Sequence, residues 1–282
     1  MSLHKNFNQQ FYDNSSWIKL FIPLSYLYQL IISTKSLLYA LKIFTSKKLP
    51  VPVIVVGNIT LGGTGKTPLL IAIAKYLKNT GHKPGIISRG YKGREGKSRE
   101  VLAQSRFQDV GDEPFMLKRC LGIPIFVGKK RVESANLMLR LYPDIDVILS
   151  DDGLQHLELS RDYEIIVVDK LRGFGNNYLL PAGPLRESKD RLSSVNAVVM
   201  NGQKEKEKHT FGMHYEANST IKSIHTDKTI EIKNLKNIEI FAATGIGNPE
   251  RFYFLLTKLG ITYNPLIFDD HYEFKDSDFY KC

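Results

Sequence analysis

The sequence predicts an α/β fold with a mostly parallel sheet and helices on both faces. Short, nearly continuous runs of β-branched residues recur along the chain of 282 residues, as in strands buried on both faces of a parallel sheet. Helical stretches fill the intervals between these runs. The first complete run, 51–56, leads into a glycine-rich turn and then a helical pattern, which is the start of a βα unit.

The N-terminal segment 1–48 is predicted to be an amphipathic helical segment that associates with membranes. Residues 1–50 carry six lysines and one acid, Asp13, so half of the net charge of +10 lies there beside apolar and aromatic residues. The longest uncharged run, 20–34, has 15 residues, whereas a spanning helix needs about 20. We therefore expect a helix in the headgroup region of an anionic membrane, with a helical hairpin packed on the protein's own core as the alternative.

The loop 57–67 predicts a nucleoside triphosphate site and hence a P-loop NTPase-type sheet. A strand that ends in glycines before a new helix offers backbone N–H groups to phosphates. Lys66 would reach the outer phosphates and the Thr67 hydroxyl would hold Mg²⁺. Pro68 suits the first turn of the helix that follows, 69–77. The expected nucleotide-binding residues of the loop are Thr60, Gly62, Gly63, Thr64, Gly65, Lys66 and Thr67, with Thr60 standing where the generic pattern has glycine.

The rest of the chain divides into a core, a polar connection and a smaller C-terminal part. We place the P-loop core at 49–201, the connection or hairpin at 202–237 and a C-terminal α/β domain at 238–282. The connection is rich in lysine, asparagine and threonine. The predicted strands are 85–88, 123–127, 146–150, 163–168, 196–200 and 238–243, and the predicted helices of the core include 114–120 and 130–141.

Acidic residues follow the apolar run 146–150. Asp151 and Asp152 occupy the place where a P-loop protein sets a carboxylate against its Mg²⁺, with Asp169 as a rival. The cluster of Gln155 and His156 just beyond favours the first pair, because α/β sheets bind ligands at the carboxyl ends of their strands.

Other candidates are ambiguous from local sequence. Asp112 and Glu113 begin a predicted helix, so Asp112 is either an N-cap or a carboxylate that accepts a hydroxyl proton. Arg89 and Arg186 are candidate phosphate ligands or ordinary surface residues, and His271 is equally open.

The cysteine and charge patterns argue against a disulfide-rich protein and against a nucleic-acid-binding protein. Cys120 and Cys282 form neither a disulfide framework nor a metal cluster, which favours a reducing compartment. The positive charge of the N-terminal segment is concentrated beside apolar and aromatic residues and forms no nucleic-acid recognition motif, so we expect no nucleic-acid partner.

Taken together, the motifs resemble the tetraacyldisaccharide 4′-kinase (lipid A 4′-kinase) family, from about residue 15 to the end. The resemblance rests on seven segments in the same order, 56–68, 88–91, 111–114, 150–156, 173–176, 180–187 and 245–252. In that family Thr60 is the expected residue of the phosphate loop.

The resemblance implies transfer of the ATP γ-phosphoryl group to the 4′-hydroxyl of a membrane-embedded tetraacyl glucosamine disaccharide 1-phosphate. The reaction would take place at the cytoplasmic face of the inner membrane of a Gram-negative bacterium, with Mg²⁺ as cofactor. The implied catalytic residues are four. Asp112 would be the general base, His271 would assist it, and Asp152 would hold these two residues in place. Lys66 is the fourth. Glu113, Asp151, Gln155 and Thr67 would surround Mg²⁺, and Arg186 and Glu187 would lie in the nucleotide site without an assigned role.

Two departures and one alternative accompany the resemblance. The family more often has Pro-Asp-His-His where this chain has 269–272, and its members usually continue beyond residue 282, so we expect an incomplete C-terminal domain. The alternative is a membrane-associated P-loop ATPase switch of the partitioning type. Those switches carry a lysine just before the two glycines, where this chain has Leu61.

Overall fold

The computed structural model describes residues 11–12, 16–91, 93–94, 96–203, 209–216, 218–223, 226, 228–235, 238–246, 249–269 and 272–280. Its contacts divide the chain into two compact units, one of residues 7–213 and the other containing 214–282. Each unit is described by itself.

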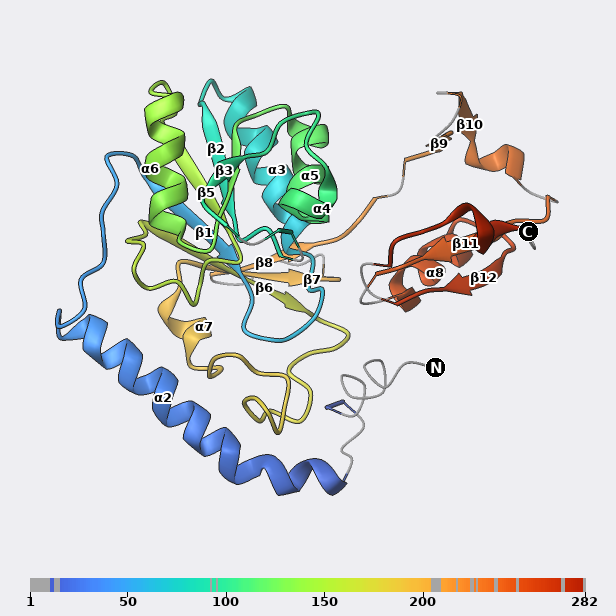
Figure 1. The fold of residues 1–282 in the computed structure, drawn as a ribbon. Helices are drawn as coiled ribbons and strands as arrows, with labels where there is room; N and C mark the ends of the chain where they lie inside the picture. Colours follow the sequence, from blue (N-terminus) through green and yellow to red (C-terminus); the bar gives the residue numbers. More distant parts are fainter. Residues whose placement is uncertain are drawn as a thin grey trace. The chain divides into compact units, whose positions relative to one another are not determined.

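An eight-stranded sheet forms the centre of the larger unit (Figure 1). Its order is β3-β4-β2-β5-β1-β6-β7-β8, and every neighbouring pair is parallel except β3 with β4. The mostly parallel sheet predicted from the β-branched runs is therefore confirmed. The strands are β1 (Val53–Gly57), β2 (Pro84–Ser88), β3 (Arg99–Glu100), β4 (Ile125–Val127), β5 (Val147–Asp151), β6 (Tyr163–Asp169), β7 (Ala197–Asn201) and β8 (Thr210–Met213).

Helices cover both faces of this sheet because its strands are apolar on both sides. Figure 1 shows α6 on one side of the strands and α3 with α5 on the other. Met138 of α6 belongs to the core layer that contains Val55, whereas Leu70 of α3 and Leu117 of α5 belong to the layer that contains Val56. The helices are α3 (Lys66–Asn79), α4 (Phe107–Val110), α5 (Asp112–Leu121), α6 (Arg131–Leu141) and α7 (Arg191–Ser194).

The edge strand β8 lies inside the stretch 202–237, which the sequence assigns to a polar connection. It pairs in parallel with β7, and Met213 packs against the core layer of α3 and α5. An edge strand needs one apolar contact rather than a continuous apolar run, so a polar composition does not prevent it from joining the sheet.

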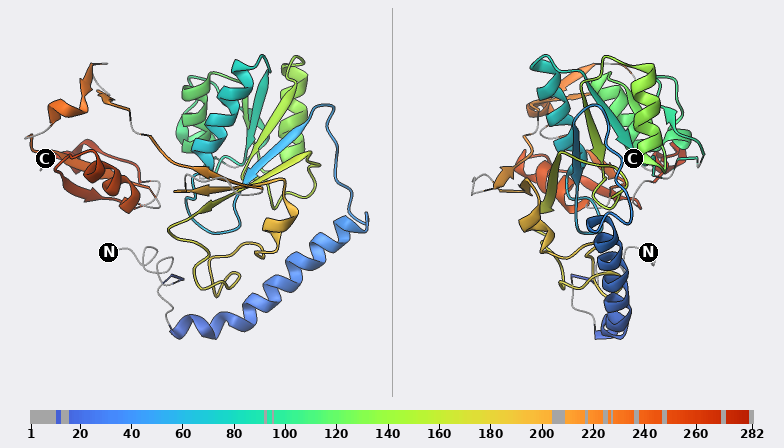
Figure 2. Two further views of the ribbon diagram at one scale, coloured as in Figure 1. Left: turned by 180° about the vertical axis from the view of Figure 1, so that it is seen from behind. Right: turned by 90° about the vertical axis from the view of Figure 1, so that its left-hand side faces the viewer.

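The N-terminal segment is a 3-10 turn, η1 (Ser16–Phe21), that runs directly into one long helix, α2 (Ile22–Ala40). Figures 1 and 2 show α2 in blue beside the segment between β6 and α7. No second helix follows α2 before β1, so the described residues 16–52 form a single long helix with its 3-10 turn rather than a helical hairpin. Among the described helices none combines the length and apolar character required to cross a bilayer.

Most apolar side chains of α2 point away from the protein. The exposed ones around the helix include Leu20, Leu24, Leu27, Leu30, Ile31, Leu37 and Leu41. A contiguous apolar surface of this kind marks an interaction surface rather than a solvated face.

The smaller unit contains two short sheets. A parallel pair, β11 (Phe241–Thr244) and β12 (Asn264–Ile267), is connected by α8 (Pro249–Lys258), and the Tyr253 hydroxyl of that helix donates to the Ala242 carbonyl at 3.0 Å. The other elements are the antiparallel pair β9 (Thr220–Lys222) and β10 (Thr229–Glu231), with η2 (Ile232–Leu235) and η3 (Asp276–Phe279).

Candidate active site

The loop between β1 and α3 has the backbone of an anion cradle. Gly62 and Gly65 have φ values of +91° and +100°, which only glycine adopts without strain. Gly65 is the N-cap of α3, so the first N–H groups of that helix have no partner within the helix. Those groups and the positive end of the helix dipole attract phosphate oxygens. Gly63, Thr64, Lys66 and Thr67 are the other residues of this loop, and their contacts with a nucleotide stay a prediction.

The side chains of two buried asparagines, Asn58 and Asn201, hydrogen-bond to the backbone of this loop. The Asn58 amide donates to the carbonyls of Thr60 at 2.8 Å and Gly62 at 3.3 Å, and the Asn201 amide donates to the Thr64 carbonyl at 2.8 Å. Thr60 is buried and forms an antiparallel bridge with Leu185. Because Thr60 has no positive φ, this position of the loop does not require glycine.

Lys66 and Arg186 meet at the carboxylate of Asp152. The Arg186 guanidinium donates to Oδ1 of Asp152 at 3.0 Å and to Oδ2 at 3.1 Å, while Nζ of Lys66 lies 3.9 Å from Oδ1. Arg186 also donates to Oδ1 of Asn58 at 3.0 Å and to Oε1 of Gln155. One guanidinium thus joins the phosphate loop to the carboxyl end of β5 (Val147–Asp151).

The backbone and charge of Asp152 are both unusual. Its φ is +48°, and its N–H donates to the Val56 carbonyl at 2.9 Å, so the strained residue is fixed directly beside β1. Burial acts to raise the pKa of Asp152, but the positive charges of Lys66 and Arg186 outweigh burial and lower that pKa. Asp152 is therefore a carboxylate at neutral pH.

Asp151 has the properties expected of a ligand for a cation. Its side chain is buried, Oδ2 accepts from the Ser88 hydroxyl at 3.0 Å, and Oδ1 has no hydrogen-bond partner. Burial raises the pKa of Asp151, and this effect outweighs the opposing charges of Lys66 and Arg131. A divalent cation at Oδ1 would satisfy that oxygen and favour the ionised form.

Gln155, another predicted metal ligand, is already hydrogen-bonded to protein side chains. The Gln155 side chain accepts from Arg186 and donates to Glu187, so its amide links two site residues in this structure. Among the described residues no three His, Cys, Asp or Glu side chains form a metal-binding group, so a cation here would also need hydroxyl, phosphate or water oxygens.

Glu187 is tied back into the protein. Its Oε2 accepts from Nε of Arg191 at 3.0 Å, and Arg191 also donates to the Glu164 carboxylate. This ion-pair network fixes the segment that carries Arg186.

Asp112 is the first residue of α5, and its N-cap is Gly111. The literal N-cap interpretation of Asp112 is therefore wrong, although Oδ1 accepts from the Glu113 N–H at 2.9 Å and the helix dipole favours both acids. The roles of Asp112 and Glu113 stay predictions, and His271 lies outside the described residues.

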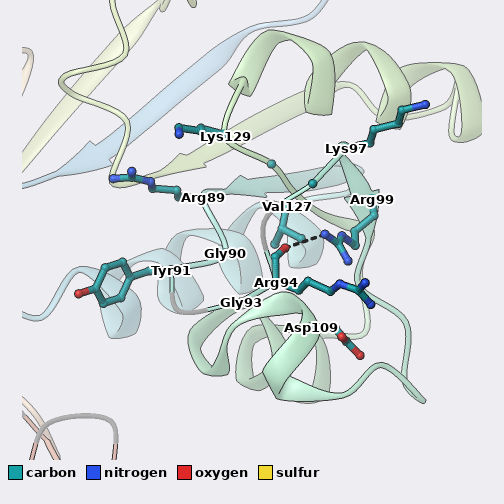
Figure 3. A pocket seen from close by; sticks show the side chains of 12 residues that line it. Arg89, Gly90, Tyr91, Gly93, Arg94, Lys97, Arg99, Asp109, Val127 and Lys129 are labelled. Atoms are coloured by element: carbon teal, nitrogen blue, oxygen red, sulfur yellow. Dashed lines mark hydrogen bonds between the residues drawn. The ribbon is translucent and has the colours of Figure 1, made fainter.

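A basic cavity of about 450 Å³ lies beside Arg89 at the carboxyl ends of β2 and β4 (Figure 3). One acid, Asp109, is present among its described lining residues, and the Arg99 guanidinium donates to the Arg94 carbonyl at 2.7 Å in its wall. The basic side chains that line it are Arg89, Arg94, Lys97, Arg99 and Lys129.

Arg131 is a site residue that the sequence analysis missed. It is buried and donates to the carbonyls of Gly128, which lines the basic cavity, at 2.8 Å and of Asp151 at 3.2 Å. Burial lowers the pKa of Arg131 to about 10, so it stays charged at neutral pH. Its position as the first residue of a helix gave no local signal, because its link to the site is the carbonyl of Asp151, 20 residues later in the sequence.

Nearly the whole chain is similar to known proteins of one family. The family model described as tetraacyldisaccharide-1-P 4′-kinase matches residues 17–282. The tetraacyldisaccharide 4′-kinase of Methylobacillus flagellatus is 42% identical over 271 residues, which cover 96% of this chain and 81% of that protein. The enzyme of the same name from Nitrosococcus oceani is 42% identical over 268 residues, covering 95% and 78%. A crystal structure of LpxK from Aquifex aeolicus in complex with ATP matches with a TM-score of 0.79 and 31% identity, covering 92% of this chain and 84% of that one.

Proposed function

This chain belongs to the tetraacyldisaccharide-1-P 4′-kinase family, and on that premise we propose what its site does. The protein is a kinase of lipid A biosynthesis. It transfers the γ-phosphoryl group of ATP to the 4′-hydroxyl of a tetraacylated glucosamine disaccharide 1-phosphate.

The observation that carries this proposal is the meeting of Lys66 and Arg186 at Asp152 beside the glycine cradle. Phosphoryl transfer requires positive charge where the equatorial oxygens gain negative charge, in a site that needs little reorganisation. Lys66 lies at the long limit of an ion pair with Asp152, so it is free to turn toward the outer phosphates, while Arg186 is held on four acceptors.

ATP as the donor is supported by the ATP complex of the Aquifex aeolicus relative. We assign Mg²⁺ to the site from the chemistry of its donors. The unpartnered Oδ1 of Asp151 fits the ion, and Thr67 and Glu113 would complete the protein ligands. When bound, Mg²⁺ supplies neutralisation of the phosphate charge.

The acceptor hydroxyl needs a carboxylate to take its proton, and Asp112 is our candidate. It stands at the N-terminal end of α5, where the helix dipole favours a negative charge. Asp152 would orient the reacting groups, and the assistance of His271 stays an expectation from the family resemblance. Carboxylate bases of this kind contribute roughly 10²–10⁴-fold to the rate.

The basic cavity next to Arg89 suits the anionic headgroup of the acceptor. Its volume of about 450 Å³ and its basic lining fit a phosphorylated sugar. Arg89, Arg94, Lys97, Arg99 and Lys129 make its lining strongly basic, so we expect the acyl chains to remain in the membrane. The exposed apolar surface of α2 supports attachment at the anionic cytoplasmic face of the inner membrane.

The direct test is mass-detected transfer of phosphate from ATP to the detergent-dispersed tetraacyl disaccharide 1-phosphate. Wild type is expected to form the 4′-phosphate, and Lys66→Ala to lose most turnover. Lys75→Ala, an exposed lysine on the same helix, is the matched control and is expected to behave as wild type. ATP consumption that proceeds at full rate with membranes but without the acceptor would instead support an ATPase switch and overturn the proposal.

A further inference from the structure

One face of α2 contacts the protein, although the rest of the helix is exposed. Ser25, Tyr28, Ile32 and Lys35 are spaced by three, four and three residues, which places them in one stripe along the helix. Tyr28 and Ile32 pack against the core layer that contains Leu179 and Leu185. The stripe therefore faces the segment that leads to Arg186.

Each polar residue of this stripe bonds to the backbone of that segment or of the Gln155 turn. The Ser25 hydroxyl donates to the Leu179 carbonyl at 2.6 Å and accepts from the Ala182 N–H at 3.1 Å. The Tyr28 hydroxyl donates to the Arg186 carbonyl at 3.1 Å. Nζ of Lys35 donates to the Gln155 carbonyl at 3.1 Å.

The two residues held by Tyr28 and Lys35 are the ones whose side chains organise the site. Arg186 donates to Asp152, and Gln155 accepts from Arg186. The Arg186 N–H also donates to the Ile59 carbonyl of the phosphate loop at 2.7 Å. A chain of contacts thus leads from the Tyr28 hydroxyl to Arg186, from Arg186 to Asp152, and from Asp152 to Lys66.

We propose that Tyr28 is a positioning residue for phosphoryl transfer, and that α2 uses one face to set Arg186 and its other faces to bind the membrane. This inference rests on the proposed function. Attachment to the membrane and alignment of the site are then properties of one rigid helix. A displacement of Arg186 by a fraction of an ångström would move its guanidinium and the carboxylate of Asp152, both of which are part of the charge arrangement around the outer phosphates.

The chemical state of Tyr28 agrees with this role. Burial raises the pKa of the Tyr28 hydroxyl, with the charge of Arg186 acting in the opposite direction, so the hydroxyl remains a donor at neutral pH. Its ring is held by the core layer, which restricts where the hydroxyl can point.

The test is Tyr28→Phe, which removes one oxygen and keeps the ring. Turnover is measured with saturating ATP and detergent-dispersed acceptor, so that attachment to a bilayer does not limit the rate. We expect kcat to fall roughly tenfold, with KM for ATP and for the acceptor within about twofold of wild type. Tyr76→Phe removes a hydroxyl from an exposed tyrosine of α3 and is expected to leave kcat unchanged.

Two further measurements make the result decisive. Sedimentation with anionic vesicles is expected to be the same for Tyr28→Phe and wild type, and rates are normalised to the folded fraction from thermal melting. A normalised kcat within twofold of wild type, or a rise in KM without a fall in kcat, would overturn the positioning role. If wild type itself did not phosphorylate the acceptor, the proposed function would fail first, and this outcome is distinct from the other two.

Discussion

Replacing Arg186 with lysine keeps the positive charge but removes the planar fork that holds the site together. The guanidinium donates to both oxygens of Asp152, to Oδ1 of Asn58 at 3.0 Å and to Gln155. A lysine ammonium is a point donor and cannot reach three side chains in different directions. The substitution therefore separates charge from geometry.

The size of the effect follows from the contacts that are lost. A hydrogen bond between charged groups contributes about 1.5–3 kcal/mol, and the 35% exposure of the Asp152 side chain places the loss there at the lower end. Leaving the oxygen of fully buried Asn58 without a donor adds about 1 kcal/mol. Allowing for partial replacement by the ammonium, we expect Arg186→Lys to lose about 2 kcal/mol of transition-state stabilisation, roughly 30-fold in kcat.

The assay is steady-state transfer to detergent-dispersed acceptor across a range of pH. Arg140→Lys, at an exposed arginine of α6, is the matched control and should change kcat by less than twofold. Arg186→Met extends the test, because it removes one of the three charges, those of Lys66, Arg186 and Arg131, that lower the pKa of Asp152 against the effect of burial. That pKa should rise, so the acid limb of the kcat profile should move to higher pH.

The reasoning would be refuted by a kcat for Arg186→Lys within threefold of wild type. It would also be refuted if Arg186→Met left the acid limb where it is in wild type.

Four further predictions concern other parts of the molecule. Asp112→Asn should lower kcat by at least about 10², with ATP binding by calorimetry unchanged, because the amide cannot accept the proton. Lys129→Gln should raise KM for the acceptor about threefold and leave KM for ATP unchanged, since it removes one charge from the basic cavity. Burial, and after it the charge of Arg131, lowers the pKa of His156 to about 4, so the folded state favours neutral histidine. The free energy of unfolding in urea should therefore fall by about 2 kcal/mol between pH 7.5 and 5. His156→Gln should not show this fall. Paired Leu27→Glu and Leu30→Glu should abolish sedimentation with anionic vesicles while retaining activity in detergent, because both leucines are more than half exposed.

Local patterns were sufficient for the frame of this protein. The β-branched runs predicted β1, β2 and β4 to β7 within a few residues, and the glycines before Lys66 located the phosphate loop. Such signals succeed because a buried parallel strand and a left-handed glycine are requirements on the residue itself. The motifs distributed along the chain also identified the family, which the match to residues 17–282 confirms.

Local sequence patterns could not show which side chains of the site contact one another, because the partners are far apart in the sequence. Local sequence left Arg186 open as a phosphate ligand or an ordinary surface residue, yet its side chain donates to Asp152, 34 residues earlier, and to Asn58, 128 residues earlier. Asp151 and Asp152 are adjacent in the sequence, but burial raises the pKa of the first, while nearby cations, Lys66 and Arg186 foremost, lower the pKa of the second.

The sequence by itself determined the sheet, the phosphate loop and the family of this protein, because each depends on the nature of single residues and their near neighbours. Only the tertiary structure decided that Arg186 joins the loop to Asp152, that Arg131 lies buried behind Asp151, and that Tyr28 of α2 bonds to the backbone of Arg186. These contacts arise when the chain closes long loops around one sheet. Their partners are set by which strand and helix ends come together, and no local pattern encodes that.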